Sequence, residues 1–330
     1  MKPEDLLKRL KKKDFAFLIG NGVNRFVLGN DVDCSWKGLL KRVANEIGVV
    51  HNLPSLDSLK SITYTEYYSM LLLEAKKAGL NEKQVQECIC SIVDGWKKEN
   101  KNSDTLYNDF QSSLIEINRP VLTTNIDKFL DSQLDGEKTQ SDFEGVFPIG
   151  LYYSSCEQHY PNNSFGVWHI NGVVDYPESL RFGLIDYSKL IIRCGELLNE
   201  KYENKETKPS ESSKRQWANN TWLGILMGKP LCIVGLGLES EEIFLRSLLL
   251  RKVRWNREKD DEPVYEPGKH GWYCYTAKDE MSDSKRELLR HMGIEPVMFD
   301  DYDAMYKGLF GIQKAKPETT EEKPLHFSDD

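Results

Sequence analysis

The sequence has 330 residues, 39% hydrophobic and 29% charged, which is enough for one large α/β domain or two smaller ones. Its 44 basic and 52 acidic residues give a net charge of −8, which argues against direct nucleic-acid binding. No stretch approaches the roughly 20 apolar residues of a membrane helix, and the start lacks a signal-peptide pattern. We therefore expect no membrane contact and a cytoplasmic location.

The seven cysteines contain no CxxC pair, and their odd number leaves at least one unpaired in any intramolecular disulfide scheme. A zinc ribbon needs two closely spaced sulfur pairs, whereas only Cys88 and Cys90 lie close together, in a segment with a helical pattern. The sequence therefore predicts reduced thiols and no bound metal.

The first predicted strand is the apolar run at residues 15–19, which stops at a glycine turn. Four amphipathic segments follow and predict helices, the first of them capped by Ser35. We interpret residues 35–118 as a helical insertion. Its larger side chains are a candidate self-association surface, although packing inside the protein is a competing use for them: Tyr67, Tyr68, Leu71, Leu72 and Trp96.

Five further strands are predicted at residues 121–124, 165–170, 231–234, 272–276 and 295–299. A helix through Phe129 and Leu130 is expected after the first of these five. Because helical patterns separate several of the strands, the sequence predicts an α/β fold with a mostly parallel sheet. The polar, acidic segment 313–330 predicts a disordered tail.

Ligands of open α/β sheets bind beyond the carboxyl ends of the strands. Gly20 and Gly22 follow the first strand, where a glycine pair lets the backbone approach a diphosphate, although a simple strand-to-helix turn also explains it. The complete dinucleotide fingerprint GxGxxG is absent. Gly235 and Gly237 form a second such turn, after which Glu239 or Ser240 is expected to cap a helix.

Polar residues also follow two other strands. Asn125 and Asp127 are separated by one residue, so in an extended turn both side chains face one cleft, although such a pair also commonly caps a helix. His169 ends the third strand; a histidine there is usually structural, but an ordinary pKa near 6.5 would let it accept a proton at neutral pH.

Taken in order, these motifs resemble those of the sirtuin-like (Sir2-type) NAD-consuming domains. Residues 20–24 (GNGVN) are similar to the family's GAGxS phosphate loop, and residues 123–127 (TTNID) to its TQNID. Residues 168–172 (WHING) look like its catalytic LHG, and residues 235–243 (GLGLESEEI) like its GxSLxxxxI ribose-binding turn. The resemblance implies a Rossmann-like NAD-binding domain over residues 1–312.

Several departures separate the chain from the deacylases of this family: the zinc-ribbon cysteines are missing, Thr124 replaces a glutamine, and Asn171 precedes Gly172. The chain is more similar to the zinc-less NADases of bacterial anti-phage defence and to filament-forming animal relatives. That resemblance implies NAD as substrate and its hydrolysis to nicotinamide and ADP-ribose in abortive infection. It also implies activation through a homo-oligomer or filament, a separate ATPase or a phage-derived trigger.

By the same resemblance, Asn125 positions the attacking water or a ribose hydroxyl, Asp127 bonds the nicotinamide amide, and His169 is the general base. The residues expected to surround the rest of NAD are Gly20, Asn21, Gly22, Asn24, Thr124, Gly235, Gly237 and Glu239. Two alternatives stay open. One is a non-catalytic sensor or scaffold that binds NAD or ADP-ribose, and the other is an NAD-dependent protein deacylase.

Overall fold

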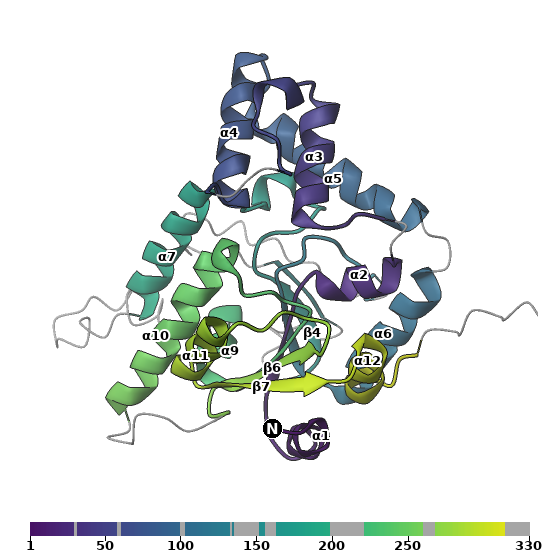
Figure 1. The fold of residues 1–330 in the computed structure, drawn as a ribbon, viewed down its shortest axis with the longest axis vertical. Helices are drawn as coiled ribbons and strands as arrows, with labels where there is room; N and C mark the ends of the chain where they lie inside the picture. The colour runs from purple at the N-terminus through teal and green to yellow at the C-terminus, as the bar shows by residue number, and fades with distance from the viewer. Residues whose placement is uncertain are drawn as a thin grey trace, which may run out of the picture.

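The computed structural model describes residues 1–29, 32–57, 61–99, 103–132, 134, 152–155, 163–198, 221–259 and 268–313. In these residues seven strands form one sheet, and helices cover both of its faces (Figure 1). The expected tail lies outside the described residues beyond residue 313, so its disorder stays a prediction. No helix in the described part of the chain is both long and apolar enough to cross a membrane.

The sheet has the order β3-β4-β2-β1-β5-β6-β7, with every neighbouring pair parallel except β3 and β4. The chain runs outward from β1 first through β2 and β4 and later through β5, β6 and β7, which is the Rossmann order with one added antiparallel edge strand. The strands are β1 (Ala16–Ile19), β2 (Pro120–Thr123), β3 (Tyr152–Ser155), β4 (Gly166–His169), β5 (Leu231–Val234), β6 (Gly271–Thr276) and β7 (Ile294–Phe299).

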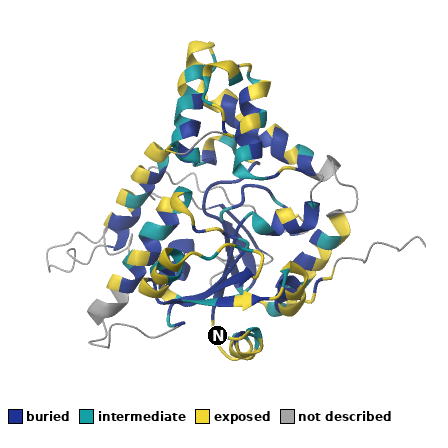
Figure 2. Cartoon of the chain, in the orientation of Figure 1, coloured by how far each residue is buried: buried dark blue, intermediate teal, exposed yellow. Residues whose placement is uncertain are grey.

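Two apolar clusters lie on opposite faces of the sheet, because successive side chains of a strand alternate in direction. On β1, Phe17 and Ile19 join one cluster, and Ala16 and Leu18 join the other. The first face is covered by α1 (Pro3–Leu10), α2 (Gly22–Leu28), α6 (Ser103–Ile117) and α12 (Tyr302–Phe310). The second is covered by α7 (Leu184–Leu198), α9 (Trp222–Gly228), α10 (Ile243–Lys259) and α11 (Asp283–His291). The strands between these two layers of helices are mostly buried and are dark blue in Figure 2.

Three helices between β1 and β2 form a lobe beyond one end of the sheet, seen at the top of Figure 1. They are α3 (Trp36–Glu46), α4 (Tyr64–Lys77) and α5 (Glu82–Glu99). As predicted, Ser35 caps α3 by accepting a hydrogen bond from the Gly38 N–H at 3.0 Å. The fourth predicted helix, α6, does not join this lobe but packs against α2 and α12 on the sheet.

For the residues considered as a candidate self-association surface, the structure confirms the competing use, which is packing inside the protein. The side chains of Tyr67, Tyr68, Leu71 and Trp96 are buried, and Leu72 is half-buried against the same core. These apolar residues at helical spacing pack the helices of the lobe against one another and against the rest of the core. The described structure therefore gives these residues a packing role rather than an exposed one.

All six predicted strands are confirmed within one or two residues, but β3 was not predicted. The predicted helix through Phe129 and Leu130 is wrong, since these residues lie in turns. There the carboxylate of Asp127 accepts a hydrogen bond from the Phe129 N–H at 3.0 Å, which stabilises a turn. The expected side-chain cap from Glu239 or Ser240 is also wrong: a 3-10 turn, η4 (Ser240–Glu242), precedes α10 and has no such cap.

Candidate functional site

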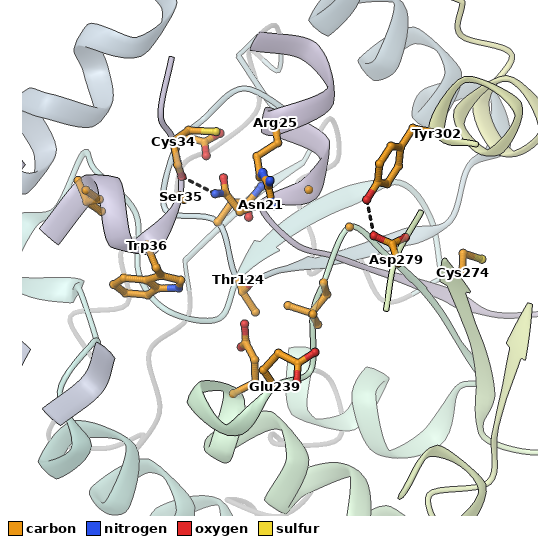
Figure 3. A pocket seen from close by; sticks show the side chains of 18 of the residues that line it. Asn21, Arg25, Cys34, Ser35, Trp36, Thr124, Glu239, Cys274, Asp279 and Tyr302 are labelled. Atoms are coloured by element: carbon orange, nitrogen blue, oxygen red, sulfur yellow. Dashed lines mark hydrogen bonds between the residues drawn. The ribbon is translucent and has the colours of Figure 1, made fainter. Parts of the chain in front are cut away.

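A cavity of about 470 Å³ opens at the carboxyl ends of β1, β2 and β5 (Figure 3). These strands meet where the order of the sheet reverses, which is where open α/β sheets bind ligands. Its volume falls within the roughly 300–1,000 Å³ typical of small-molecule sites. The cavity therefore lies where the sequence motifs predicted a binding site.

Two glycine turns form the floor of this cavity by touching each other. The N–H of Gly22, after β1, donates to the carbonyl of Gly235, after β5, at 2.7 Å. A Cβ atom on Gly22 would lie 2.6 Å from the Gly235 Cα, and one on Gly20 would lie 2.6 Å from the Gly235 oxygen. Gly235 itself has φ +65°, which glycine adopts without strain. These glycines are needed first for the contact between the two turns.

Asn125 presents an unpaired acceptor at the end of β2. The Thr123 hydroxyl donates to the Ile19 carbonyl at 2.9 Å and accepts from the Asn125 N–H at 3.0 Å, which fixes this turn. Asn125 lines the cavity, and its Nδ2 reaches the Gly20 carbonyl only at 3.4 Å. Its Oδ1 is buried with no hydrogen-bond partner among the described residues. Because a buried acceptor without a donor is costly, this oxygen is suited to a ligand hydroxyl, amide or water.

Asp127 also lines the cavity, and Asn24 supports it from behind. One carboxylate oxygen of Asp127 accepts from the Asn24 Nδ2 at 2.6 Å. Asn24 is fully buried: its Nδ2 also donates to the Asn21 Oδ1 at 3.0 Å, and its Oδ1 accepts from the Tyr107 hydroxyl at 3.2 Å. Burial raises the pKa of Asp127 above its usual value. Asn24 was expected to bind NAD, which stays a prediction; in the structure its polar atoms are bonded to protein, and it supports the Asp127 carboxylate.

Replacing Asn24 by alanine is expected to lower the free energy of unfolding by about 2–3 kcal/mol, since a buried carboxylate loses a donor. Urea denaturation of the full chain measures this change. Asn45→Ala, the same substitution at an exposed position of α3, is the control and should change stability by less than about 0.5 kcal/mol. Equal stability of the two variants would contradict a supporting role for Asn24.

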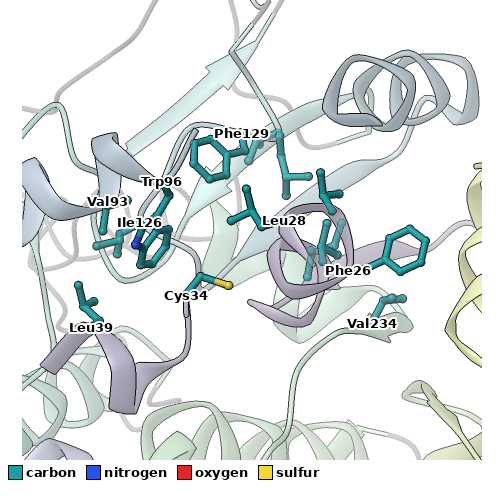
Figure 4. Packing of buried hydrophobic residues seen from close by; sticks show 14 of the residues in the cluster. Phe26, Leu28, Cys34, Leu39, Val93, Trp96, Ile126, Phe129 and Val234 are labelled. Atoms are coloured by element: carbon teal, nitrogen blue, oxygen red, sulfur yellow. The ribbon is translucent and has the colours of Figure 1, made fainter. Parts of the chain in front are cut away.

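Aromatic side chains from the helical lobe and Phe182, which precedes α7, close the Asn125 end of the cavity. Trp36 and Phe182 pack edge to face with ring centroids 4.7 Å apart, and Trp96 lies beside Ile126 and Cys34 (Figure 4). Within the described structure, the buried indole Nε1 of Trp96 has no hydrogen-bond acceptor. This end therefore combines apolar walls with an unpaired donor and an unpaired acceptor, a combination that suits an aromatic carboxamide.

The opposite end of the cavity is polar and is built from β6 and from the segments after β5, β6 and β7. Asp279 and Tyr302 lie on the right of Figure 3. Lys285 pairs with Glu239 at 2.6 Å and lies 5.1 Å from the ring centre of Tyr273. The Tyr302 hydroxyl donates to Asp279. Carboxylates and phenols of this kind suit the hydroxyl groups of a sugar.

The described cavity walls carry more acidic than basic side chains, so an anionic ligand has few cations to meet. The two basic side chains are Arg25 and Lys285, of which Lys285 is already paired with Glu239. Burial, followed by the charges of Glu241 and Glu239, raises the pKa of Glu242 to about 7. Arg25 is therefore the described cation best placed for a diphosphate. The sequence could have indicated Arg25, because this basic residue occupies the position of the third glycine in GxGxxG, directly after the first glycine turn.

His169 lies away from the cavity, in the sheet and behind the Asn125 turn. It is 2% exposed and is absent from the described cavity walls. Its Nδ1 lies 3.0 Å from the Asn125 carbonyl and its Nε2 lies 3.3 Å from the Asp131 carboxylate. The Ser154 hydroxyl on β3 donates to the same Asp131 oxygen at 2.5 Å. The unpredicted strand β3 is thus what covers His169.

Eight of the eleven predicted site residues line one cavity, and three do not. Gly20, Asn24 and His169 stand behind its walls, in contact with residues that form them. The eight are Asn21, Gly22, Thr124, Asn125, Asp127, Gly235, Gly237 and Glu239. The sequence did not single out the cavity residues Arg25, Trp36, Phe182, Tyr273, Asp279, Lys285 and Tyr302.

The strand order and a cavity at the switch point define a Rossmann-like α/β protein. A family model for the SIR2-like domain matches residues 119–297, more than half of the chain. The chain therefore belongs to the SIR2-like domain family, as its four motifs indicated. Membership associates it with NAD-related activity in general. No curated protein sequence matches the chain.

Proposed function

We propose that this protein is an NAD⁺ hydrolase that cleaves the bond between nicotinamide and ribose. Water adds its hydroxyl to the ribose carbon, the electron pair of the broken bond stays with nicotinamide, and one proton is released. The products are nicotinamide and ADP-ribose. The four ordered motifs and membership of the SIR2-like family support NAD as the substrate.

The observation that carries this proposal is the unpaired Oδ1 of Asn125, buried beside Asp127 in the aromatic end of the cavity. A bound water or ribose hydroxyl can donate to this oxygen and be held in line with the ribose carbon. The Asp127 carboxylate would accept from the nicotinamide amide, and Trp36 and Trp96 would exclude bulk water from the charged transition state. Binding alone would not require this unpaired acceptor beside Asp127.

At the other end of the cavity, the sugar of the adenosine half would meet Glu239 and Asp279, and Arg25 would face the diphosphate. We further propose that the hydrolase is a defence effector that is silent until it assembles or meets a partner. An enzyme that consumes NAD continuously would be toxic to its own cell, which is why gating is expected.

The test is to incubate the full chain with NAD and to measure nicotinamide and ADP-ribose by chromatography, with NAD binding followed by calorimetry. We expect both products in equal amounts. Binding without product at any assembly state would favour the sensor or scaffold, and O-acyl-ADP-ribose as the main product with an acyl-lysine peptide would favour the deacylase. Light scattering gives the assembly state in parallel, and full activity of a demonstrably monomeric sample would contradict gating.

A further inference from the structure

The buried indole of Trp96 carries a hydrogen-bond donor that has no acceptor. Trp96 lies on α5, is 3% exposed and lines the Asn125 end of the cavity. Its Nε1 has no hydrogen-bond partner in the part of the chain that the structure describes. An indole nitrogen can only donate, and a buried donor without a partner costs free energy. The cavity wall therefore holds one polar atom that the protein leaves unsatisfied.

The neighbours of this ring explain why the protein does not satisfy it. Val93, three residues earlier on α5, and Ile126 appear beside Trp96 in Figure 4, and their side chains hold no acceptor. Burial raises the pKa of the Cys34 thiol to about 11, so this neighbour stays a neutral thiol and a weak acceptor. The acceptor that these side chains do not supply can come from a ligand in the cavity.

A second indole in the described structure shares this feature but lies outside the cavity. Trp272 on β6 is fully buried, and its Nε1 also lacks a partner. It belongs to the same apolar cluster as Trp96 but is absent from the described cavity walls. An unpaired indole alone therefore does not indicate a ligand. Trp96 differs because it lies in the same cavity as Asn125 and Asp127, beside Ile126, the residue between them.

We infer that Trp96 is a specificity-determining residue for the leaving group: its indole N–H donates to the carboxamide oxygen of nicotinamide. A primary carboxamide needs a donor for its oxygen and acceptors for its nitrogen. The Asp127 carboxylate accepts one hydrogen bond at each oxygen, from the Phe129 N–H and from Asn24, which leaves lone pairs for the amide N–H₂. Trp96 supplies the donor. The inference rests on the proposed substrate, NAD, and extends the proposed function to the recognition of its nicotinamide end.

The donor and the acceptor come from different parts of the chain. Asp127 lies inside residues 119–297, the segment that matches the SIR2-like family, whereas Trp96 lies outside it. Trp96 belongs to the helical lobe between β1 and β2, which also supplies Trp36 to the same wall. The lobe is therefore part of the nicotinamide site and not only a cover over it.

Calorimetry with two ligands that are not hydrolysed tests this contact. Carba-NAD keeps the nicotinamide but has a methylene in place of the ring oxygen of the nicotinamide ribose, whereas ADP-ribose lacks the nicotinamide. Trp96→Phe keeps an aromatic ring and removes the N–H. We expect it to weaken carba-NAD binding about tenfold, the value of one hydrogen bond in an enclosed site. The affinity for ADP-ribose should stay within about twofold, because ADP-ribose makes no contact with Trp96.

Trp272→Phe is the matched control, since it removes an equally buried and unpaired N–H from outside the described cavity walls. It should leave the ratio of the two affinities as in the wild type. Equal weakening of both ligands by Trp96→Phe, or no change in either, would overturn the inference. A wild-type chain that does not bind carba-NAD would overturn the proposed function as well, whereas binding without hydrolysis of NAD would overturn only the hydrolase.

Nuclear magnetic resonance follows the indole itself. In ¹⁵N-tryptophan-labelled full chain, the Trp96 indole signal is the one that Trp96→Phe removes. An N–H that gains an acceptor shifts downfield, so we expect this shift with carba-NAD and not with ADP-ribose. The Trp272 signal should move with neither ligand. An unmoved Trp96 signal in the carba-NAD complex would overturn the inference.

Discussion

Asn125→Ala is expected to lower the rate of nicotinamide release at least 100-fold while leaving NAD binding within about threefold of the wild type. The size follows from what comparable positioned polar groups contribute to a transition state, roughly 10²–10³ in rate. Stability should change by less than about 1 kcal/mol, because the side chain makes a single 3.4 Å hydrogen bond and its Oδ1 has no partner among the described residues. Single-turnover release of nicotinamide measures the effect.

Two controls decide whether the loss belongs to the unpaired oxygen. Asn45→Ala makes the same chemical change on an exposed helix face and should leave release unchanged. Asn125→Asp keeps an acceptor at the same place but adds a charge beside the buried Asp127, so it should bind NAD more weakly and recover little activity. Normal turnover of folded Asn125→Ala would remove Asn125 from the chemistry.

The strands at the centre of the sheet could be predicted because local sequence alone specifies them. β1 and β5 are continuous apolar runs that end in glycine turns, a pattern that parallel strands covered on both faces require. The prediction failed where local signals are weak. β3 (Tyr152–Ser155) is short and half polar, and it is a strand because β4 offers it a free edge. The turn at Phe129 likewise depends on the Asp127 carboxylate rather than on an apolar period.

The sequence predicted those site residues that directly follow the ends of strands, and missed the others. That rule found Asn125, Asp127 and both glycine turns, since carboxyl ends of parallel strands meet at one edge. It could not say which side chains face the ligand. Asn24 meets Asp127 across 103 residues of sequence, and β3 covers His169, so both turn away from the cavity into protein contacts. The aromatic wall comes from Trp36 and Trp96 of the helical lobe and from Phe182 before α7, residues that look like ordinary core in the sequence.

Only part of the site lies within the segment that matches the SIR2-like family. Residues 119–297 contain Asn125, His169 and the Gly235 turn, but not β1 or the turn that follows it. The fold places β1 between β2 and β5, so Gly22 completes the floor of the cavity from outside the matched segment, with Gly20 behind it. The contact between Gly22 and Gly235 is therefore the point at which the two parts of the site are joined.

Gly22→Ala tests that contact directly. The added methyl group would lie 2.6 Å from the Gly235 Cα and 2.8 Å from its oxygen, and both neighbours are backbone atoms that cannot rotate away. We expect the free energy of unfolding to fall by about 1–3 kcal/mol, as overpacking of a close contact does. Because the moved turn also carries the cavity floor, NAD binding should weaken more than tenfold. Urea denaturation and calorimetry measure the two effects.

Gly228→Ala is the matched control, since a methyl group there meets nothing within 4 Å at the end of α9 and should leave both stability and binding unchanged. Gly237→Ala separates the two functions of glycine at this site. Its methyl group would meet only Glu239, the side chain at 3.4 Å and the backbone nitrogen at 4.0 Å, so the fold should tolerate it while the cavity wall changes. Wild-type stability of Gly22→Ala would contradict the close contact between the two turns, and wild-type NAD binding would contradict the role of this turn in the cavity floor.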